Sequence, residues 1–129
     1  MTVAEGAQWV LRGALALAFV VMGVAHFRPG PARTMAAMIP PRLRRDGLLS
    51  PVFLVRFTGV CEVAGGIGIL LPVTRTAATI ALVAFLIAVW PANHYAADHP
   101  ERFGSVATPF WPRYFGQLGL IAAVVLAAV

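Results

Sequence analysis

Seven polar residues whose side chains could bind or protonate a ligand stand out in a sequence made mostly of apolar residues. They are Glu62, His26, Arg56, Asn93, His94, Arg113 and Gln117. The carboxylate and the imidazoles could exchange protons, and the two guanidinium groups could hold an anionic or carbonyl group. The same side chains could instead link helices to one another, or, for Arg56 and Arg113, extend to the lipid head groups.

Glu62 is the most informative of the seven because its neighbours along a helix are small. Gly59 lies three residues before it, and Gly65 and Gly66 lie three and four residues after it. An intramembrane charge costs at least about 2.5–3.5 kcal/mol, so the carboxylate should face the bundle interior and contact a polar group. We predict that His26, Arg56 or His94 supplies that group. The glycines allow either close helix packing or room for a ligand over the acid.

The depth of Glu62 shapes the expected site. The helical rise puts Glu62 about 9 Å deeper than Arg56, while the other polar candidates lie near the level of Arg56. We therefore expect a polar site that opens toward the arginine-rich loops, with Glu62 at its floor. Because His26 and Glu62 would differ in depth by more than a helical turn, a shared metal ion would be strained. No metal site is predicted.

The elements that position these residues follow from composition. Hydrophobic residues make up 60% of the chain and charged residues 12%, about half the share in a soluble domain. The apolar residues form four runs near the length that crosses a bilayer. The prediction is an all-α protein, a transmembrane four-helix bundle in a single domain over residues 1–129. The expected helices cover about residues 9–27, 51–72, 76–94 and 112–129, with an arginine-rich loop at 28–50. The first run has no basic residues before it, so it is expected to be retained rather than cleaved as a signal peptide.

The two halves of the sequence share a weak repeated pattern. His26-Phe27 and His94-Tyr95 each precede a loop, and an Arg-aromatic-x-Gly pattern follows each loop, at Arg56 and at Arg113. Two explanations remain open, which are chance and a duplication that makes two parallel helical-hairpin repeats.

Charge predicts the orientation and the class of partner. The net charge of +5 comes entirely from arginine. Five arginines, at positions 28, 33, 42, 44 and 45, share the first loop with one acid, Asp46. Arginine-rich short loops stay cytoplasmic, so loops 28–50 and 97–112 are expected in the cytoplasm and both termini outside. The expected partner is the lipid bilayer, with a homo-oligomer or a membrane or soluble redox partner as further options and no nucleic acid. The single Cys61 excludes an intramolecular disulfide and a Cys-x-x-Cys centre.

Several segments together resemble the DoxX family. They are His26-Phe27, Met38-Ile39-Pro40-Pro41, the Gly-x-x-Glu-x-x-Gly-Gly stretch from Gly59 to Gly66, Pro72-x-Thr74-Arg75, and Pro91-Ala92-Asn93. The resemblance implies a four-helix protein of the bacterial inner membrane. Some relatives are subunits of thiosulfate:quinone oxidoreductase, and others accompany oxidative-stress and thiol systems. His94-Tyr95 departs from the family pattern, and nothing in the sequence shows a thiosulfate site.

The function expected from this resemblance and from the polar residues is a small redox-associated or quinone-facing membrane subunit. His26, Arg56 and His94 would surround the quinone head group. One alternative is a non-catalytic membrane anchor that assembles a partner through its glycine face and first loop. The other is a small transporter or proton path.

Overall fold

A computed structural model describes residues 1–47, 50–103 and 109–129 of the chain. Within these ranges every regular element is helical, which confirms the all-α prediction. The elements are α1 Val3–Ala25, α2 Pro29–Met38, the 3₁₀ turn η1 Pro41–Leu43, α3 Pro51–Leu70, α4 Arg75–Ala88, α5 Trp90–Asp98, α6 Pro100–Phe103 and α7 Phe110–Ala128. Residues 48–49 and 104–108, which belong to the predicted loops 28–50 and 97–112, lie outside the described residues.

In the described part of the chain, four segments are long and apolar enough to cross a membrane, judged by length and composition: Val3–Ala25, Pro51–Leu70, Arg75–Asp98 and Phe110–Ala128. They correspond to the four predicted helices. The first begins earlier than the apolar run at about residue 9, because Thr2 and Glu5 form a capping box. The Thr2 hydroxyl accepts from the Glu5 amide at 3.1 Å, and the Thr2 amide donates to the Glu5 carboxylate at 2.7 Å.

The third segment, predicted at about residues 76–94, contains a break that the sequence analysis did not describe. Helix α4 ends at Ala88 and α5 begins at Trp90, with Val89 between them. Pro91 explains the break, because proline lacks the amide donor and its ring clashes with the carbonyl four residues earlier. The two pieces together form one segment, Arg75–Asp98, that is long enough to cross a membrane.

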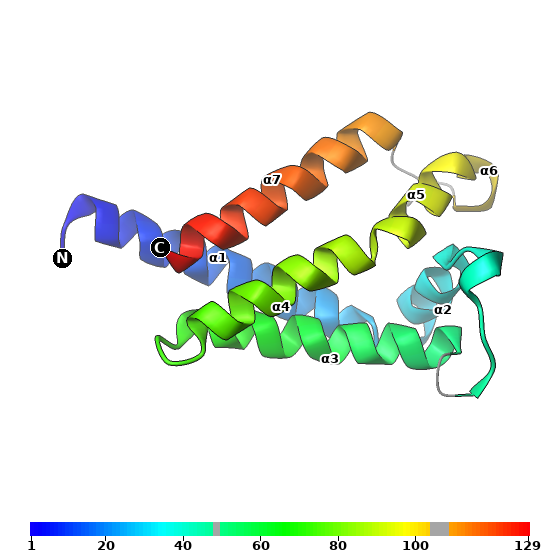
Figure 1. Ribbon diagram of the computed structural model, residues 1–129, viewed down its shortest axis with the longest axis horizontal. Coiled ribbons are helices and arrows are strands. Elements are labelled where there is room, and N and C mark those ends of the chain that lie inside the picture. The colour runs from blue at the N-terminus through cyan, green and yellow to red at the C-terminus, as the bar shows by residue number, and fades with distance from the viewer. Residues whose placement is uncertain (48–49, 104–108) are drawn as a thin grey trace.

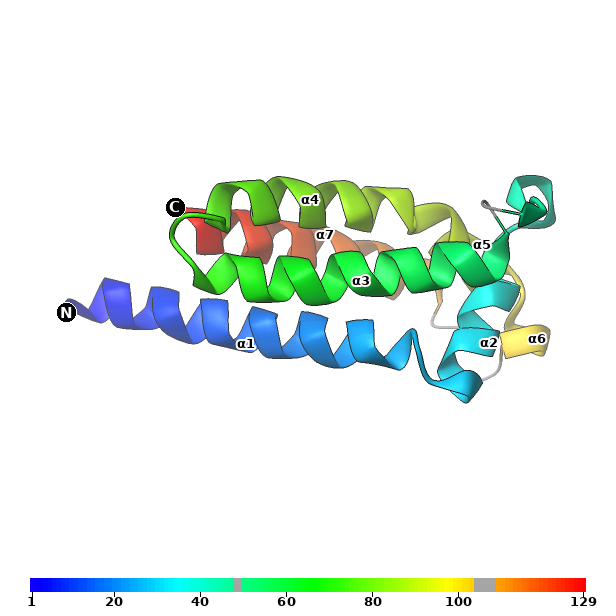
Figure 2. The ribbon, with the colours of Figure 1, turned by 90° about the horizontal axis from the view of Figure 1, so that it is seen from below.

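The long helices run alongside one another, with both chain termini at one end (Figure 1). Helix α1 lies along α3, and a short turn connects α3 to α4 (Figure 2). Helix α7 packs on α4 and contacts α1 near the termini. At the other end α2 lies across the bundle, close to α5 and α6 (Figure 2).

Two apolar clusters hold this arrangement. The larger joins the four long helices and includes Phe19, Ile69, Leu82 and Val124, the last three fully buried. The smaller consists of Met38, Ala96 and Phe103, which fasten α2, α5 and α6 together. Many other large apolar side chains remain exposed on the long helices, which is the distribution expected of a surface that faces lipid rather than water.

Candidate functional site

The central polar feature is a contact between Glu62 on α3 and His26, which caps the C-terminus of α1. Glu62 Oε2 lies 2.7 Å from His26 Nε2, and both side chains are about nine-tenths buried. As predicted, the Glu62 carboxylate points into the bundle and contacts a polar group from another helix. Of the three predicted partners, His26 is the one that the structure places there.

The other ring nitrogen of His26 determines the proton count. Nδ1 lies 2.9 Å from the Val55 carbonyl oxygen and 3.1 Å from the Thr58 hydroxyl. A carbonyl only accepts, so we assign a proton to Nδ1. The short contact between Nε2 and Glu62 then requires one further proton, held by the ring or by the carboxyl group. In either case the pair is neutral overall, which lowers the cost of placing it among apolar helices.

This contact is short, but it is not aligned as a normal hydrogen bond. Its length is that of a charge-assisted hydrogen bond. Even so, Glu62 Oε2 and the hydroxyl of Thr79 are the two buried side-chain atoms, in the part of the chain that the structure describes, without a hydrogen bond of normal geometry. We attribute the link between His26 and Glu62 mainly to charge attraction at short range, which is strong where water is excluded.

The space next to the glycines beside Glu62 is occupied by neighbouring helices. A Cβ on Gly59 would lie 2.6 Å from the His26 Cβ, and one on Gly66 would lie 3.1 Å from the Ala16 carbonyl oxygen. A Cβ on Gly65 would lie 2.5 Å from a Leu82 methyl carbon. Of the two alternatives left open by the sequence, the structure favours close helix packing.

The expected depth difference between His26 and Glu62 was wrong. Helix α1 ends level with Gly59 rather than with the start of α3, because the chain turns at His26 and α2 packs against α3 instead. His26 therefore reaches the level of Glu62. Among the described residues no group of three or more His, Cys, Asp or Glu side chains could hold a metal ion.

A second polar group joins α5 to α7. The Arg113 guanidinium donates to the Asn93 side-chain oxygen at 2.7 Å, and the Asn93 amide donates to the Gln117 oxygen at 3.4 Å. The Gln117 amide donates to the Leu86 carbonyl at 2.6 Å. That carbonyl belongs to the last turn of α4, where intrahelical donors run out. Gln117 thus supports the helix break, a role that the sequence did not reveal.

His94 and Arg56 do not join the site around Glu62. His94 is exposed on α5 and lies 3.5 Å from Asp98, one helical turn away. Arg56 is exposed on α3, next to the buried stripe that carries Val55 and Glu62. The predicted arrangement of His26, Arg56 and His94 around one ligand is therefore not formed.

A shallow cavity of about 410 Å³, largely open to the surface, lies beside His94, between the segment after α2 and helix α5. Its walls are formed by Pro40, Pro41, Arg42, Pro91, His94, Tyr95 and Asp98. The His94 ring also stacks on Trp90, with centroids 6.4 Å apart, and meets Phe110 edge to face at 5.4 Å. Glu62 does not line this cavity, so the acid is not the floor of the opening that the structure shows at the loop end.

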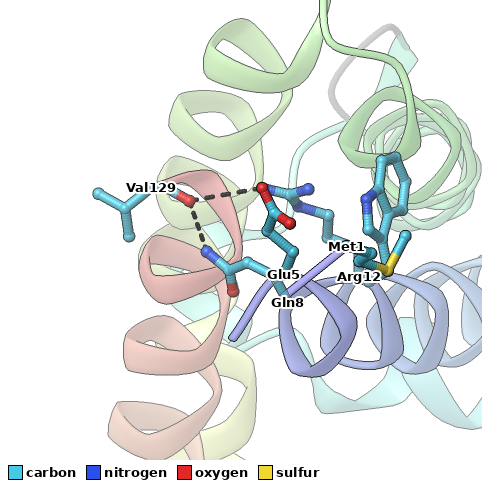
Figure 3. Close-up of a pocket in the computed structure, with 6 residues that line it drawn as sticks. Met1, Glu5, Gln8, Arg12 and Val129 are labelled. Atoms are coloured by element: carbon cyan, nitrogen blue, oxygen red, sulfur yellow. Dashed lines mark hydrogen bonds between the residues drawn. The ribbon is translucent and has the colours of Figure 1, made fainter. Parts of the chain in front are cut away.

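The opposite end of the molecule holds contacts that the sequence did not indicate. The Arg12 guanidinium, on α1, donates to the Ala127 carbonyl at 2.8 Å. Arg12 and the Gln8 amide also donate to the Val129 carbonyl (Figure 3). A cavity of about 420 Å³ adjoins these contacts. A cation near the last carbonyls of a helix is favourable because it complements the helix dipole. Arg12 and Gln8 therefore fasten α7 to α1.

Arg75 repeats this arrangement at the end of α3. Its guanidinium donates to the Ile69 carbonyl at 2.8 Å and lies 5.3 Å from the centre of the Trp9 ring, which Arg12 approaches at 4.9 Å. The indole thus lies within cation–π distance of both arginines. The sequence signal for this contact was a basic residue about one turn from a predicted helix end.

Across the described residues, these features define an all-helical protein with four helices that could cross a membrane and a buried His–Glu pair where α1 meets α3. The chain belongs to the family described as a domain of unknown function, DUF8561, whose sequence model matches residues 15–128. No curated protein and no solved structure matches the chain. The resemblance to the DoxX family stays a prediction.

Proposed function

We propose that this chain is a multi-pass protein of the bacterial inner membrane that acts as a DoxX-like, redox-associated subunit and binds a quinone head group. The four apolar helices support the membrane location, and the resemblance noted in the sequence supports the class. The cavity beside His94 is the observation that carries the quinone proposal.

The cavity suits a quinone head group in size and in chemistry. Its volume of about 410 Å³ is within the range of roughly 300–1,000 Å³ typical of small-molecule sites. Quinone carbonyls accept hydrogen bonds, and the His94 imidazole and the Arg42 guanidinium can donate them. Proline rings and the Tyr95 side chain supply the apolar surface against which a flat ring packs. The site lies at the loop end of the bundle, where a head group would enter from the bilayer surface.

His94 and Asp98 have distinct roles in this proposal. With both ring nitrogens protonated, His94 donates to a quinone carbonyl through Nδ1, while Nε2 lies 3.5 Å from the Asp98 carboxylate, which orients the ring. Arg42 favours an anionic form of the ligand over the neutral one. The ion pair of His26 and Glu62 acts at a distance, by fixing where α1 ends and α2 begins.

Binding of ubiquinone-1, a short-chain quinone, to the detergent-purified protein tests this proposal. Trp90 stacks on His94, so quenching of tryptophan fluorescence should report binding. We expect His94→Leu to weaken binding at least about tenfold, the loss of one hydrogen bond to a polar group. His99→Leu is the matched control, because His99 does not line the cavity. Equal affinities in wild type and His94→Leu, or no saturable quenching, would refute the quinone site.

A second candidate function is a non-catalytic module that anchors or assembles a partner. The closed contact of α1 with α3 argues against a ligand site at Glu62, because the glycines around Glu62 leave no space for a ligand there. A protein partner that copurifies in fixed stoichiometry, together with absence of quinone, would favour assembly over quinone binding. The glycine face itself is covered by α1 and α4, so such a partner would bind elsewhere.

A further inference from the structure

Three exposed arginines at the loop end carry charge that no acid of the described residues pairs with. Arg28 precedes α2, Arg33 lies on it, and Arg45 follows η1. Within residues 1–47, 50–103 and 109–129, the side chains of Arg28 and Arg33 make no hydrogen bond. One nitrogen of Arg45 donates to the Arg42 and Arg44 carbonyls, at 2.9 Å each, and its guanidinium stays exposed. We call Arg28, Arg33 and Arg45 the basic face.

Arg44 shows that neighbours in the sequence have different roles. It is half-buried, and its guanidinium donates to the Ile39 carbonyl at 2.9 Å and to the Ala37 carbonyl at 3.0 Å. These carbonyls end α2, so Arg44 caps that helix. The arginine-rich segment is thus divided into a residue that stabilises the fold and residues whose charge is available to a ligand.

Helix α2 places Arg28 and Arg33, two members of the basic face, at the loop end. It lies across the loop end of the bundle (Figure 2), and its buried side packs through Met38 on Ala96 and Phe103. The exposed side, which carries Arg33, faces away from that cluster. Helices α1 and α3 end and begin beside α2, so in a membrane the basic face lies where the hydrocarbon gives way to head groups.

The charge of this face lacks a local counter-charge. Asp46, the acid in residues 28–50, is exposed and forms no ion pair with any described residue. Guanidinium groups bind phosphate oxygens in a two-pronged geometry, and clusters of arginine beside a membrane segment are attracted to anionic lipids. An acidic protein would satisfy charge as well, but it would not explain why the face lies at head-group level.

We propose that Arg28, Arg33 and Arg45 form a binding surface for the phosphate groups of anionic phospholipids. The proposal rests on the membrane location in the proposed function and is independent of quinone. Such a surface prefers anionic to zwitterionic phospholipids, because in a zwitterionic head group a cationic group offsets the charge of the phosphate.

Titration of the detergent-purified protein with dioctanoyl phosphatidylglycerol, followed by its unfolding temperature, tests the surface. We expect a saturable rise in unfolding temperature, and no rise with dioctanoyl phosphatidylcholine. The triple variant Arg28→Gln, Arg33→Gln, Arg45→Gln should weaken apparent affinity about 100-fold, at about fivefold per arginine. Arg44→Gln is the matched control, and it should lower the unfolding temperature without lipid while changing the affinity less than the triple variant does.

Three results would overturn the proposal. The triple variant could respond to phosphatidylglycerol as the wild type does, or phosphatidylcholine could stabilise equally well. Inorganic phosphate or polyglutamate could also reproduce the full effect at matched charge, which would point to a free anion or to an acidic protein. The ubiquinone-1 titration separates this surface from the quinone site, because the triple variant should bind quinone normally and His94→Leu should bind phosphatidylglycerol normally.

Discussion

Glu62 lies in an apolar part of the bundle where a lone carboxylate would be costly, and His26 resolves that cost. The two side chains together carry no net charge, and the Val55 carbonyl and the Thr58 hydroxyl fix the ring of His26. Such a pair contributes little stability by itself, because desolvation offsets much of the attraction. Its main effect is to specify how α1 packs on α3, since the two side chains meet at only one position of α1 along α3.

Leucine substitutions test this dependence at the residue scale. His26→Leu should destabilise the protein by about 3–5 kcal/mol, because it leaves the Glu62 carboxyl group buried without its partner. The double variant His26→Leu, Glu62→Leu should be more stable than His26→Leu alone, since no unpaired polar group remains. Unfolding of the purified protein in detergent measures both.

His94→Leu serves as the control for this comparison. Its pair with Asp98 is about half exposed, so its loss should cost less than about 1 kcal/mol. If the losses of stability caused by His26→Leu and by Glu62→Leu simply added in the double variant, the two residues would act independently, against the coupling argued above.

The sequence predicted the inward orientation of Glu62 but not its partner. Small residues at Gly59, Gly65 and Gly66 marked the helix face that packs, and an intramembrane acid needs a polar contact. Which of His26, Arg56 and His94 contacts Glu62 depends on the position of α1 along α3, and the packing of α2 determines that position. Long-range packing of this kind has no local sequence signal.

At the scale of elements, the contact of α1 with α3 depends on how closely the two backbones approach. Added Cβ atoms on Gly23 and Gly59 would lie 2.9 Å from the Gly59 carbonyl oxygen and 3.0 Å from the Gly23 carbonyl oxygen, respectively. Backbone atoms cannot move aside as a flexible side chain can. The absence of a Cβ at both positions therefore sets the helix separation, and with it the distance between His26 and Glu62.

Gly59→Ala should destabilise the protein by about 1–3 kcal/mol, the cost of overpacking a tight contact. Gly116→Ala is the matched control on α7, where an added Cβ would have no neighbour within 4 Å, so it should be neutral or slightly stabilising. Thermal unfolding of both variants beside the wild type measures the difference. Equal stability of the two variants would mean that α1 and α3 can separate at little cost.

Helix boundaries show where sequence patterns succeed and where they stop. Hydropathy located the four long segments, because a span needs about 20 apolar residues whatever it packs against. It missed the first turns of α1, which a capping box of Thr2 and Glu5 forms from polar residues. It also passed over the break at Val89, although Pro91 was a visible signal for it.

At the scale of the whole molecule, the two ends differ in how their arginines are used. Arg12 and Arg75, at the end that holds the termini, donate to the last carbonyls of α7 and α3. The basic face lies at the other end and is exposed. The exposed arginines therefore gather at the loop end, and short loops rich in arginine are the ones that stay in the cytoplasm.

Single cysteines at the two ends test the orientation. In a Cys61→Ala background, Val73→Cys lies in the turn between α3 and α4, where Val73 is 95% exposed. Asp46→Cys lies at the loop end and is also exposed. If loop 28–50 is cytoplasmic, a membrane-impermeant maleimide should label Val73→Cys in intact spheroplasts and Asp46→Cys only after lysis. The reverse pattern would place the basic face outside the cell and would contradict the predicted orientation. Labelling of both cysteines before lysis would instead contradict a membrane crossing between α3 and the first loop.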